Sequence, residues 1–342
     1  MAGHRRAPIL PVDVVGAGIS GLSAARSLLE HGLEVRVFEK SRGLGGRSAT
    51  RRIGELSFDH GAQYFTIRDE RWAQAVAPLE EQGVIARWEP RIVRVLADGA
   101  VGKAKVSERY VGIPGMSALG GALARDNEVV RETRIASLLR SDGGGWNLAS
   151  DDGPMLGPFS AVVVTCPAPQ AADLLDDVAP ALAASCRAAV MHPCWAAMVA
   201  FGESLGLDFD AAFVDDPVLA WAACESSKPG RATSLEGWTL HATPEWSAER
   251  IEDPAGEVAE ALLRRFLHLV AEAEELSPVI RVAHRWRFAR SAQPRSLGQV
   301  VDGEALLGVA GDWTGGDRLE GAFLSGVRVA DAIADALSPA VG

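Results

Sequence analysis

The stretch that decides the fold is Val12–Glu39, which reads VDVVGAGISGLSAARSLLEHGLEVRVFE. A short apolar strand at Val12–Val15 leads directly into a turn with glycines at positions 16, 18 and 21. A helical pattern of apolar residues follows, and a second apolar strand, Glu34–Phe38, ends at the acid Glu39. This order of strand, glycine turn, helix, strand and acid is typical of a dinucleotide-binding unit.

Each residue of the turn has a separate task in such a unit. Gly16 permits the tight turn, Gly18 lets the backbone approach a pyrophosphate, and Gly21 lets the helix pack closely on the strand. The helix N-terminus offers free N–H groups and a partial positive charge to phosphates. Glu39 accepts hydrogen bonds from ribose hydroxyls and disfavours a 2′-phosphate, which predicts a dinucleotide that is not of the NADP type. The alternative is a glycine-rich turn that binds no ligand.

A second pair of glycines, Gly45 and Gly46, lies within the sequence Arg42-Gly-Leu-Gly-Gly-Arg47. A domain that binds NAD does not need this pair, whereas a longer cofactor passes its second half under such a loop. Bare backbone at the two glycines permits a close approach, and Arg42 or Arg47 offsets phosphate charge. The combination favours FAD over NAD, with a flexible basic loop as the alternative.

Composition excludes several classes of partner. The 342 residues carry 34 Lys and Arg against 45 Asp and Glu, for a net charge of −11, which disfavours nucleic acid and anionic membrane surfaces. The four cysteines form no CxxC pair, so we expect free thiols in a reducing compartment and no metal site. No apolar stretch is long enough to span a bilayer, and the basic start runs directly into the first strand. We therefore expect a soluble cytoplasmic protein, monomeric or weakly dimeric.

The rest of the chain alternates between strand and helix patterns. We expect strand at Ile85–Val95, a loop opening a helix over Tyr110–Arg125, and paired strands at Val129–Leu139 and Trp146–Ala149. The pattern further predicts a strand running into a turn over Gly237–Ser247, an amphipathic helix at Pro254–Ala273, and a strand at Val279–Trp286. A last apolar strand and a glycine-rich loop precede a closing helix, Glu320–Leu337.

The return of the opening pattern at the C-terminus predicts an α/β protein whose nucleotide domain is discontinuous. We expect an FAD-binding, Rossmann-like domain of the glutathione-reductase type with an inserted α+β substrate domain, and an active site where the two meet. The expected FAD-binding segments are residues 8–75, 110–168 and 285–342. The expected substrate-domain segments are residues 76–109 and 169–284.

Several longer motifs resemble the flavin-containing amine oxidase superfamily, and most closely its bacterial renalase-like branch. The resemblance covers nearly the whole chain. It is carried by the segments GAGISGLSAARSL, EKSRGLGGRSATRR, DHGAQYFT, TCPAPQAADLL, WTLHATPEWS, HRWRFARS and GDWTGGDRLEGAFLSG. The first two are shared by the wider superfamily, and DHGAQYFT, HRWRFA and GDW…EGAFLSG are narrower.

The resemblance implies FAD and assigns its contacts along the chain. It places pyrophosphate at the first glycine turn, adenosine ribose at Glu39, the isoalloxazine near residues 60–64, and the ribityl–phosphate side at Asp312. The implied cofactor-binding residues are Gly16, Ala17, Gly18, Ser20, Gly21, Glu39, Lys40, Gly46, Arg47, His60, Gly61, Ala62, Gln63, Tyr64, Ile135, Thr165, Gly311, Asp312, Glu320, Gly321 and Ala322.

The helix that begins near Glu320 gives a physical reason for the last of these placements. Its N–H groups and positive dipole end would face N1 and the C2 carbonyl of the flavin, where the reduced ring is anionic. The glycine-rich loop before it contains no cysteine, so we expect FAD to be held noncovalently. The alternative for Asp312 is a turn residue that leads into the helix.

Departures from amine oxidases weaken a simple amine-oxidase interpretation. Members of that family often place a lysine near flavin N5, on the strand matching His192–Val199, and none occurs there. They also tend to hold the amine between two aromatic side chains, frequently tyrosines, and this chain has only Tyr64 and Tyr110. The tryptophans available as substitutes are Trp195, Trp221, Trp238 and Trp286.

The resemblance to renalases implies an oxidase that takes hydride at flavin N5 from the 2- or 6-dihydro isomers of NAD(P), with O2 reoxidation giving H2O2. Such a donor needs no general base, because losing hydride makes its ring aromatic. We expect Tyr64, His241 and Trp286 to orient it, with Gln63 as a hydrogen-bonding neighbour. His241 has the alternative of a polar residue at a strand edge, and Trp286 that of core packing. Arg285 and Arg287 either receive a phosphate-bearing substrate or are simply solvated.

Two other functions fit the same motifs. One is an oxidase or desaturase acting on an amine, a porphyrinogen or a polyene. The other is a flavin-binding sensor without catalysis.

Overall fold

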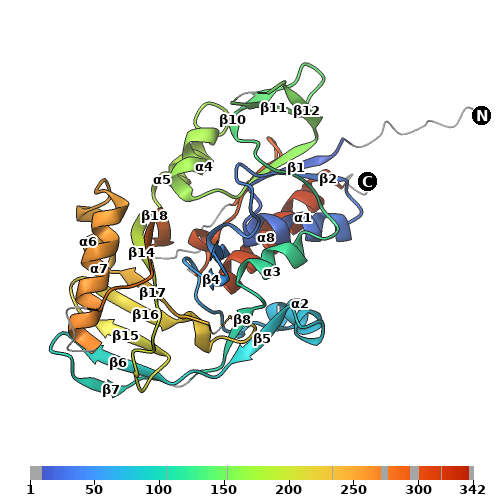
Figure 1. The fold of residues 1–342 in the computed structure, drawn as a ribbon. Helices are drawn as coiled ribbons and strands as arrows, with labels where there is room; N and C mark the ends of the chain where they lie inside the picture. Colours follow the sequence, from blue (N-terminus) through green and yellow to red (C-terminus); the bar gives the residue numbers. More distant parts are fainter. Residues whose placement is uncertain are drawn as a thin grey trace, which may run out of the picture. The chain divides into compact units, whose positions relative to one another are not determined.

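The structure is a computed structural model that describes residues 10–105, 107–151, 153–232, 234–270, 276–292, 300–316 and 318–338. The chain divides into two compact units, each built from separated segments. The first unit comprises Met1–Gly46, Leu123–Val190 and Gln293–Gly342, and the second comprises Arg47–Ala122 and Met191–Ala292. Figure 1 labels most of the helices and strands of both.

The first unit is built on a six-stranded sheet that is parallel except at one edge. Its strands, in spatial order, are β19 (Val301–Asp302), β20 (Leu307–Val309), β13 (Ala161–Val164), β1 (Val12–Val15), β2 (Val35–Phe38) and β9 (Glu128–Val130). Every residue of β1 and β13 is buried. Strands covered on both faces read as continuous apolar runs, which is why these two segments are rich in valine.

Helices α1 (Ile19–Glu30) and α8 (Leu319–Leu337) of this unit pack side by side (Figure 1). Ser23 of α1 lies against Gly326 of α8, and its hydroxyl donates to the carbonyl of Phe323 at 3.0 Å. The unit also contains α4 (Ala168–Leu175), α5 (Pro180–Arg187) and an antiparallel sheet of β10 (Ile135–Arg140), β11 (Trp146–Ser150) and β12 (Leu156–Phe159).

The first glycine turn has the tight geometry that the sequence predicts. Gly16 has φ +108°, a conformation that L side chains rarely adopt. A Cβ at Gly21 would overlap the carbonyl oxygen of Gly16 and come within 2.7 Å of Thr165 Oγ1. The Thr165 hydroxyl lies 2.9 Å from the carbonyl of Val15, so it fastens the end of β13 to the end of β1. Only glycine fits where α1 approaches this turn.

The second unit is built on a seven-stranded sheet. Its strands, in spatial order, are β18 (Ile280–Ser291), β14 (Met191–Phe201), β17 (Glu236–Ala242), β16 (Leu219–Cys224), β15 (Ala211–Asp215), β6 (Ile92–Leu96) and β7 (Val101–Lys103). Helix α7 (Ala255–Val270) packs on this sheet and buries Leu262 and Phe266 against Trp195 and Trp238. Both tryptophans are therefore core residues of this unit.

Smaller elements complete the described chain. Two antiparallel pairs of strands belong to the second unit, the hairpin of β3 (Arg51–Ile53) with β4 (Leu56–Phe58), and β5 (Ile85–Trp88) with the more distant β8 (Arg109–Gly112). The remaining helices are α2 (Glu70–Glu81), α3 (Ser117–Leu123) and α6 (Pro244–Glu249), with 3-10 turns at Gly46–Ser48, Glu225–Ser227 and Asp312–Thr314. Within the parts of the chain described, no helix combines the length and apolarity that crossing a bilayer requires.

Four expected elements differ from those in the structure. The strand predicted at Ile85–Val95 is two strands, because Pro90 interrupts it. The strand predicted at Val129–Leu139 is also two, because Glu132 takes φ +56° and sends β9 and β10 into different sheets. The turn predicted after Gly237 is helix α6, which the side chain of Thr243 caps. Tyr110 belongs to strand β8 and not to a loop.

The compact units divide the chain at positions other than the predicted domain boundaries. Segment 47–75 lies in the second unit, where Phe58 of β4 meets Gly237 of β17. Segment 110–122 joins the same unit because β8 pairs with β5, and segment 285–292 because β18 continues through the sheet. Segment 169–190 lies in the first unit with α4 and α5. The predicted limits at residues 8 and 342 lie outside the described residues.

We predict that Gly21→Ala destabilises the cofactor-free protein by about 3 kcal/mol or more, because its Cβ meets backbone that cannot move without opening the β1 turn. Gly121→Ala in α3 is the matched control, since a Cβ there meets nothing within 4 Å. Urea unfolding of both variants measures the difference. Equal midpoints for the two variants would mean that the turn relaxes at little cost.

Candidate functional site

The N-terminus of α1 forms an open cradle in the first unit. Its N-cap residue is Gly18, which has no side chain to accept a hydrogen bond. The first N–H groups of the helix are therefore not capped by a side chain. A Cβ on Gly18 would meet nothing within 4 Å. The hydroxyl of Ser20 is buried and has no hydrogen-bond partner. Open space, free N–H groups and an orphaned hydroxyl together fit a bound pyrophosphate.

Glu39 is held at the carboxyl end of β2 with its carboxylate already oriented. One oxygen accepts from the Ala17 amide and the other from the Ser41 amide, each at 2.8 Å. A carboxylate has about four acceptor positions, so two remain for ribose hydroxyls. The neighbouring Lys40 is exposed, and its amine donates to Gln170 Oε1 at 3.4 Å.

The second glycine pair packs against the first turn. The Gly45 amide donates to the Ala17 carbonyl at 2.8 Å, and Gly46 has φ +56°. A Cβ on Gly46 would come within 3.2 Å of Gly18 Cα. The two glycine motifs predicted from the sequence therefore meet within the first unit, and this contact requires bare backbone.

The N-terminus of α8 is the second helix end of the first unit that the sequence singles out. The helix begins at Leu319, without a side-chain cap, and a Cβ on Gly321 would overlap the carbonyl oxygen of Gly316. Asp312 is buried in the 3-10 turn before it. The first residue of β10, Ile135, is 6% exposed. Gly321 is thus required by packing, whatever faces the helix end.

The second unit places three histidines and a tryptophan in one cluster. His60 stacks on Trp286 with ring centres 5.2 Å apart, and its ring centre is 4.7 Å from that of His284. The Trp286 indole donates to the His60 carbonyl at 2.9 Å. His241 lies on β17, and its interaction with the His60 backbone joins it to this cluster. The structure therefore brings together two of the three residues expected to orient the substrate.

One alternative for His241 was a polar residue at a strand edge. In the structure its strand lies inside the sheet. Strand β17 has neighbours on both sides, with Ala196 and Trp221 as the register partners of His241. Its Nε2 has no hydrogen-bond partner. Burial lowers the pKa of His241 to about 4, and burial with the charge of His284 lowers the pKa of His60 to about 4. Both imidazoles are neutral at neutral pH.

Tyr64 sits in a separate aromatic group of the second unit. Its ring centre lies 5.6 Å from that of Trp221 and 6.1 Å from that of Trp88. The guanidinium carbon of Arg109 lies 5.0 Å from the Tyr64 ring centre, a cation–π distance. Of the tryptophans named as substitutes for a second tyrosine, Trp221 is the one beside Tyr64.

A cluster of four buried charges holds the segment that carries these residues. We call Asp59, Glu225, Lys228 and Arg231 the charge cluster. The Lys228 ammonium lies 2.8 Å from Glu225 Oε2 and 3.2 Å from Asp59 Oδ2, and Arg231 also contacts Asp59. Both cations lower the pKa of Asp59, although burial opposes them, and burial raises the pKa of Glu225.

The charge cluster fixes the orientation of Gln63. Its Oε1 accepts from Lys228 Nζ at 3.3 Å and from the Trp221 indole at 3.4 Å, and its Nε2 donates to the Asp59 carbonyl. Lys228 thus uses its three donors on Asp59, Glu225 and Gln63. The Gln63 amide has one orientation because a cation faces its oxygen.

Residues 47 and 61 meet in the same unit. The Arg47 carbonyl accepts from the Ala62 amide at 2.9 Å, and a Cβ on Gly61 would overlap that carbonyl. The Arg47 guanidinium donates to the Ala289 carbonyl at 3.1 Å. Arg285 and Arg287, by contrast, both bind Glu252, at 3.0 and 2.6 Å, so their charges are already paired.

Sequence reasoning missed the charge cluster, His284 and Arg109. Asp59 opens the DHGAQYFT motif and His284 opens HRWRFARS, but neither received a role. Lys228 is one of only four lysines in the chain, which was the available signal. The four cysteines are free, as expected, and burial raises the pKa of Cys166, Cys186 and Cys194 to about 12. In the described ranges, no group of three or more His, Cys, Asp or Glu side chains is placed to hold a metal ion.

Two protein-family models match the chain. The model of NAD(P)-binding Rossmann-like domains matches residues 14–79, and that of flavin containing amine oxidoreductases matches residues 100–334. Among solved structures, cyclohexylamine oxidase from Brevibacterium oxydans IH-35A has a TM-score of 0.73 at 14% identity, covering 96% of this chain and 99% of that one. Putrescine oxidase bound to putrescine has a TM-score of 0.69 at 14% identity, covering 95% and 99%.

Similarity to curated proteins is found over short stretches of sequence. A carotenoid 3,4-desaturase from Haloarcula japonica is 41% identical over 58 residues, which is 17% of this chain and 12% of the desaturase. The chain thus matches about an eighth of that relative's length. The similar structures confirm the α/β fold with a Rossmann-like domain, and at their level of identity they bear on the fold alone.

We predict that Lys228→Met destabilises the protein by roughly 3 to 5 kcal/mol, because it leaves two buried carboxylates facing Arg231 alone. Lys103→Met is the matched control, since it removes an exposed lysine that has no ion pair in the described structure. Urea unfolding of both variants gives the comparison. The charge cluster contributes nothing to stability if both variants unfold at the same midpoint.

We predict that His60 makes the protein sensitive to mild acid. The unfolded chain binds a proton at the usual histidine pKa near 6.5, but the folded chain does so only near 4, so stability is lost as pH falls between these values. The share due to His60 is roughly 1 to 3 kcal/mol. His60→Phe keeps the stacking and removes this share, which urea unfolding at pH 6.5, 5.5 and 4.5 measures. Parallel losses in wild type and variant would show that His60 protonates freely.

Proposed function

The chain belongs to the family of flavin containing amine oxidoreductases, and on that premise we propose that it oxidises the 2- or 6-dihydro isomers of NAD(P). Membership makes it an FAD-dependent oxidoreductase. FAD, when bound, accepts a hydride at N5 and passes the electrons to O2, which yields H2O2. What this chain contributes is the binding, orientation and electrostatic surroundings of donor and cofactor.

The first unit supplies residues suited to the ADP half of FAD. Gly18 and Ser20 at the start of α1 fit the pyrophosphate, and the oriented carboxylate of Glu39 fits the adenosine ribose. The partial positive charge at the N-terminus of α8, which has no side-chain cap, favours negative charge. The last cysteine of the sequence is Cys224, so we propose that these contacts hold FAD noncovalently.

The second unit supplies residues suited to a flat, uncharged donor ring. Tyr64 and Trp221 offer aromatic surface, and the amide of Gln63 has a fixed orientation beside them. His60 and Trp286 provide a second stacked pair. Orientation of the donor and exclusion of water are the work such residues can do.

The observation that supports the donor assignment is that the described histidines and carboxylates around this segment are weak or already paired bases. Burial also lowers the pKa of His284, the third histidine of the cluster. His60 and His241 are neutral and have pKa values near 4, too low for efficient proton abstraction at neutral pH. The carboxylates of Asp59 and Glu225 are occupied by Lys228 and Arg231. A dihydropyridine becomes aromatic by losing hydride alone, so it needs no base.

Oxidation of an amine is the second candidate. The similarity of fold to cyclohexylamine oxidase and putrescine oxidase favours it, as does the aromatic pair of Tyr64 and Trp221. An amine donor must reach the site as the free base, because its ammonium form has no electron pair to help hydride leave.

Anaerobic stopped-flow mixing of the FAD-loaded protein with each donor distinguishes the candidates. We expect the 2- and 6-dihydro isomers to bleach the oxidised-flavin absorbance within one turnover, and admitted O2 to restore it with one H2O2 per donor. Ordinary 4-dihydro NADH serves as the matched control. Bleaching by putrescine or cyclohexylamine, and not by the isomers, would replace this proposal with the amine candidate. A flavin that no donor bleaches would indicate a sensor.

A further inference from the structure

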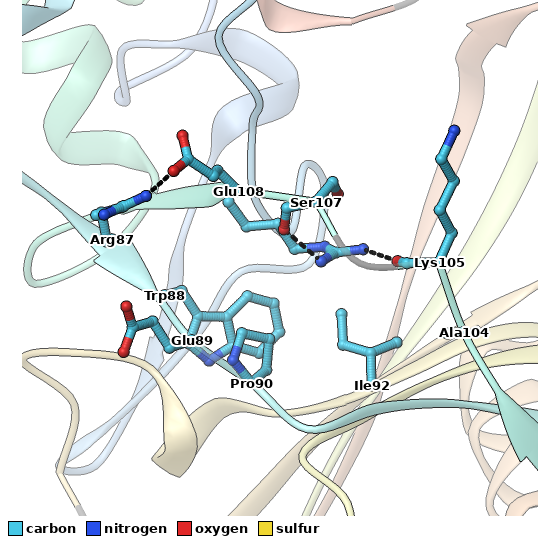
Figure 2. A pocket seen from close by; sticks show the side chains of 10 residues that line it. Arg87, Trp88, Glu89, Pro90, Ile92, Ala104, Lys105, Ser107 and Glu108 are labelled. Atoms are coloured by element: carbon cyan, nitrogen blue, oxygen red, sulfur yellow. Dashed lines mark hydrogen bonds and ion pairs between the residues drawn. The ribbon is translucent and has the colours of Figure 1, made fainter.

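Two adjoining hollows lie on the second unit, and Trp88, which lines the first, has its ring centre 5.7 Å from Lys228 Nζ of the charge cluster. The first has a volume of about 290 Å³ and is lined by the segment that joins β5 to β6 and by the residues before β8 (Figure 2). The second has a volume of about 340 Å³ and is lined by Arg94, Lys103 and Phe213, among others. Ala104 and Lys105 line both hollows, so the two share a wall.

Cations exceed anions around these hollows once ion pairs are set aside. Arg87 is paired with Glu108, and the two stand together on one side of the first hollow with Lys105 on the other (Figure 2). Arg94 is paired with Asp215 at 3.1 Å. The lining charges that remain without an ion pair in the described structure are Lys103, Lys105, Arg109 and the opposing Glu89.

Arg109 is a buried cation of the first hollow, and its position is fixed by the fold. It is 6% exposed, and its guanidinium donates only to backbone carbonyls, that of Ser107 at 2.8 Å and that of Lys105 at 3.5 Å. Its Nε has no acceptor. Carbonyl dipoles orient a guanidinium but do not cancel its charge, and a buried charge normally has a counter-ion. In a chain of net charge −11, an uncompensated buried cation indicates an anionic ligand.

The hollows are connected to the aromatic group around Tyr64. Arg109 stacks on the Tyr64 ring itself. Phe213, which lines the second hollow, has its ring centre 4.8 Å from that of Trp221, which in turn contacts Tyr64. An anion bound here would therefore lie next to residues that contact the proposed donor-binding side chains, Arg109 against Tyr64 and Phe213 against Trp221.

We propose that the paired hollows bind a nucleoside diphosphate group, namely the phosphate-bearing end of a dinucleotide donor; this rests on the function proposed above. Lys103 and Lys105 supply mobile point charges, and Arg109 supplies a fixed one. Charge-assisted hydrogen bonds to phosphate oxygens are about twice as strong as neutral ones. Amines carry no phosphate, so this site selects dinucleotide donors over amines.

ADP-ribose is the probe for this site. The FAD-loaded protein is the material, because FAD bound as proposed above would keep ADP-ribose out of the first glycine turn. We expect titration calorimetry to detect ADP-ribose binding to wild type, with affinity that falls as salt rises. Lys103→Glu/Lys105→Glu should weaken it at least tenfold. Both lysines are exposed, so the double variant is expected to fold. Arg264→Glu, an exposed charge reversal on α7, is the matched control.

A kinetic readout separates this site from general destabilisation. In the double variant, kcat/KM for a dihydro dinucleotide should fall at least tenfold relative to that for an N-alkyl dihydronicotinamide of the same ring isomer, which carries no phosphate. An unchanged ratio, no binding of ADP-ribose to wild type, or equal binding by the double variant and Arg264→Glu would each overturn the proposal. If ADP-ribose binds through the two lysines but no dihydro isomer reduces the flavin, the anion site stands and the proposed function is wrong.

Discussion

The second unit depends on one buried carboxylate, that of Asp59. It has no exposed surface, yet it accepts from the Thr50 hydroxyl at 2.7 Å, the Met116 amide at 2.9 Å, and the cations Lys228 and Arg231. These donors come from three separate segments of the chain, because Lys228 and Arg231 lie three residues apart. A buried charge is tolerated only when it is paired and hydrogen-bonded. The carboxylate therefore fixes these three segments relative to one another.

The fixed position of Asp59 also constrains the candidate site, because the two are adjacent in sequence. Residues 60–64 follow Asp59 directly, so the side chains proposed to face the donor start from a fixed backbone position. Lys228 carries the constraint one step further by orienting the Gln63 amide. Charge thus does the positioning in this unit, and the aromatic rings around Tyr64 pack on the result.

The first unit is organised by sterics instead. Gly21, Gly46 and Gly321 each stand where a Cβ would press on neighbouring backbone, and each lies at a helix start or at the turn beside one. Bare backbone brings helix N-termini and peptide N–H groups close to the space that a phosphate or an anionic ring would fill. Helix N-termini and peptide N–H groups can bind such an anion without an ionised side chain. This suits a cofactor that must be bound regardless of which donor is oxidised.

Neutrality and charge are separated within the second unit. His60 and His241 have pKa values near 4 that keep them uncharged, while the charge cluster is internally balanced. The unbalanced cations lie elsewhere, at Lys103, Lys105 and Arg109. This distribution suits a donor with an uncharged reacting ring and a highly charged remote end.

The sequence by itself determined the parts whose signals are local. The strand, the glycine turn, helix α1, strand β2 and the position of Glu39 follow from steric rules and periodicity within about thirty residues, and the structure confirms them. The order of the motifs also predicted the α/β class, and the resemblance of the longer motifs predicted the family, whereas the renalase-like branch stays a prediction. Boundaries such as the break at Pro90 were missed because one strand pattern fits both sides of it.

Only the tertiary structure decided which distant residues meet. Lys228 binds Asp59 across 169 residues of chain, and Trp286 binds the His60 carbonyl across 226. The same is true of Trp195 and Trp238, which the fold buries in the core, and of Trp221, which it places beside Tyr64. An ion pair or a ring contact between distant residues produces no periodic pattern in the sequence around either residue. Its energy depends on burial and distance, and both are set only when the sheets have formed.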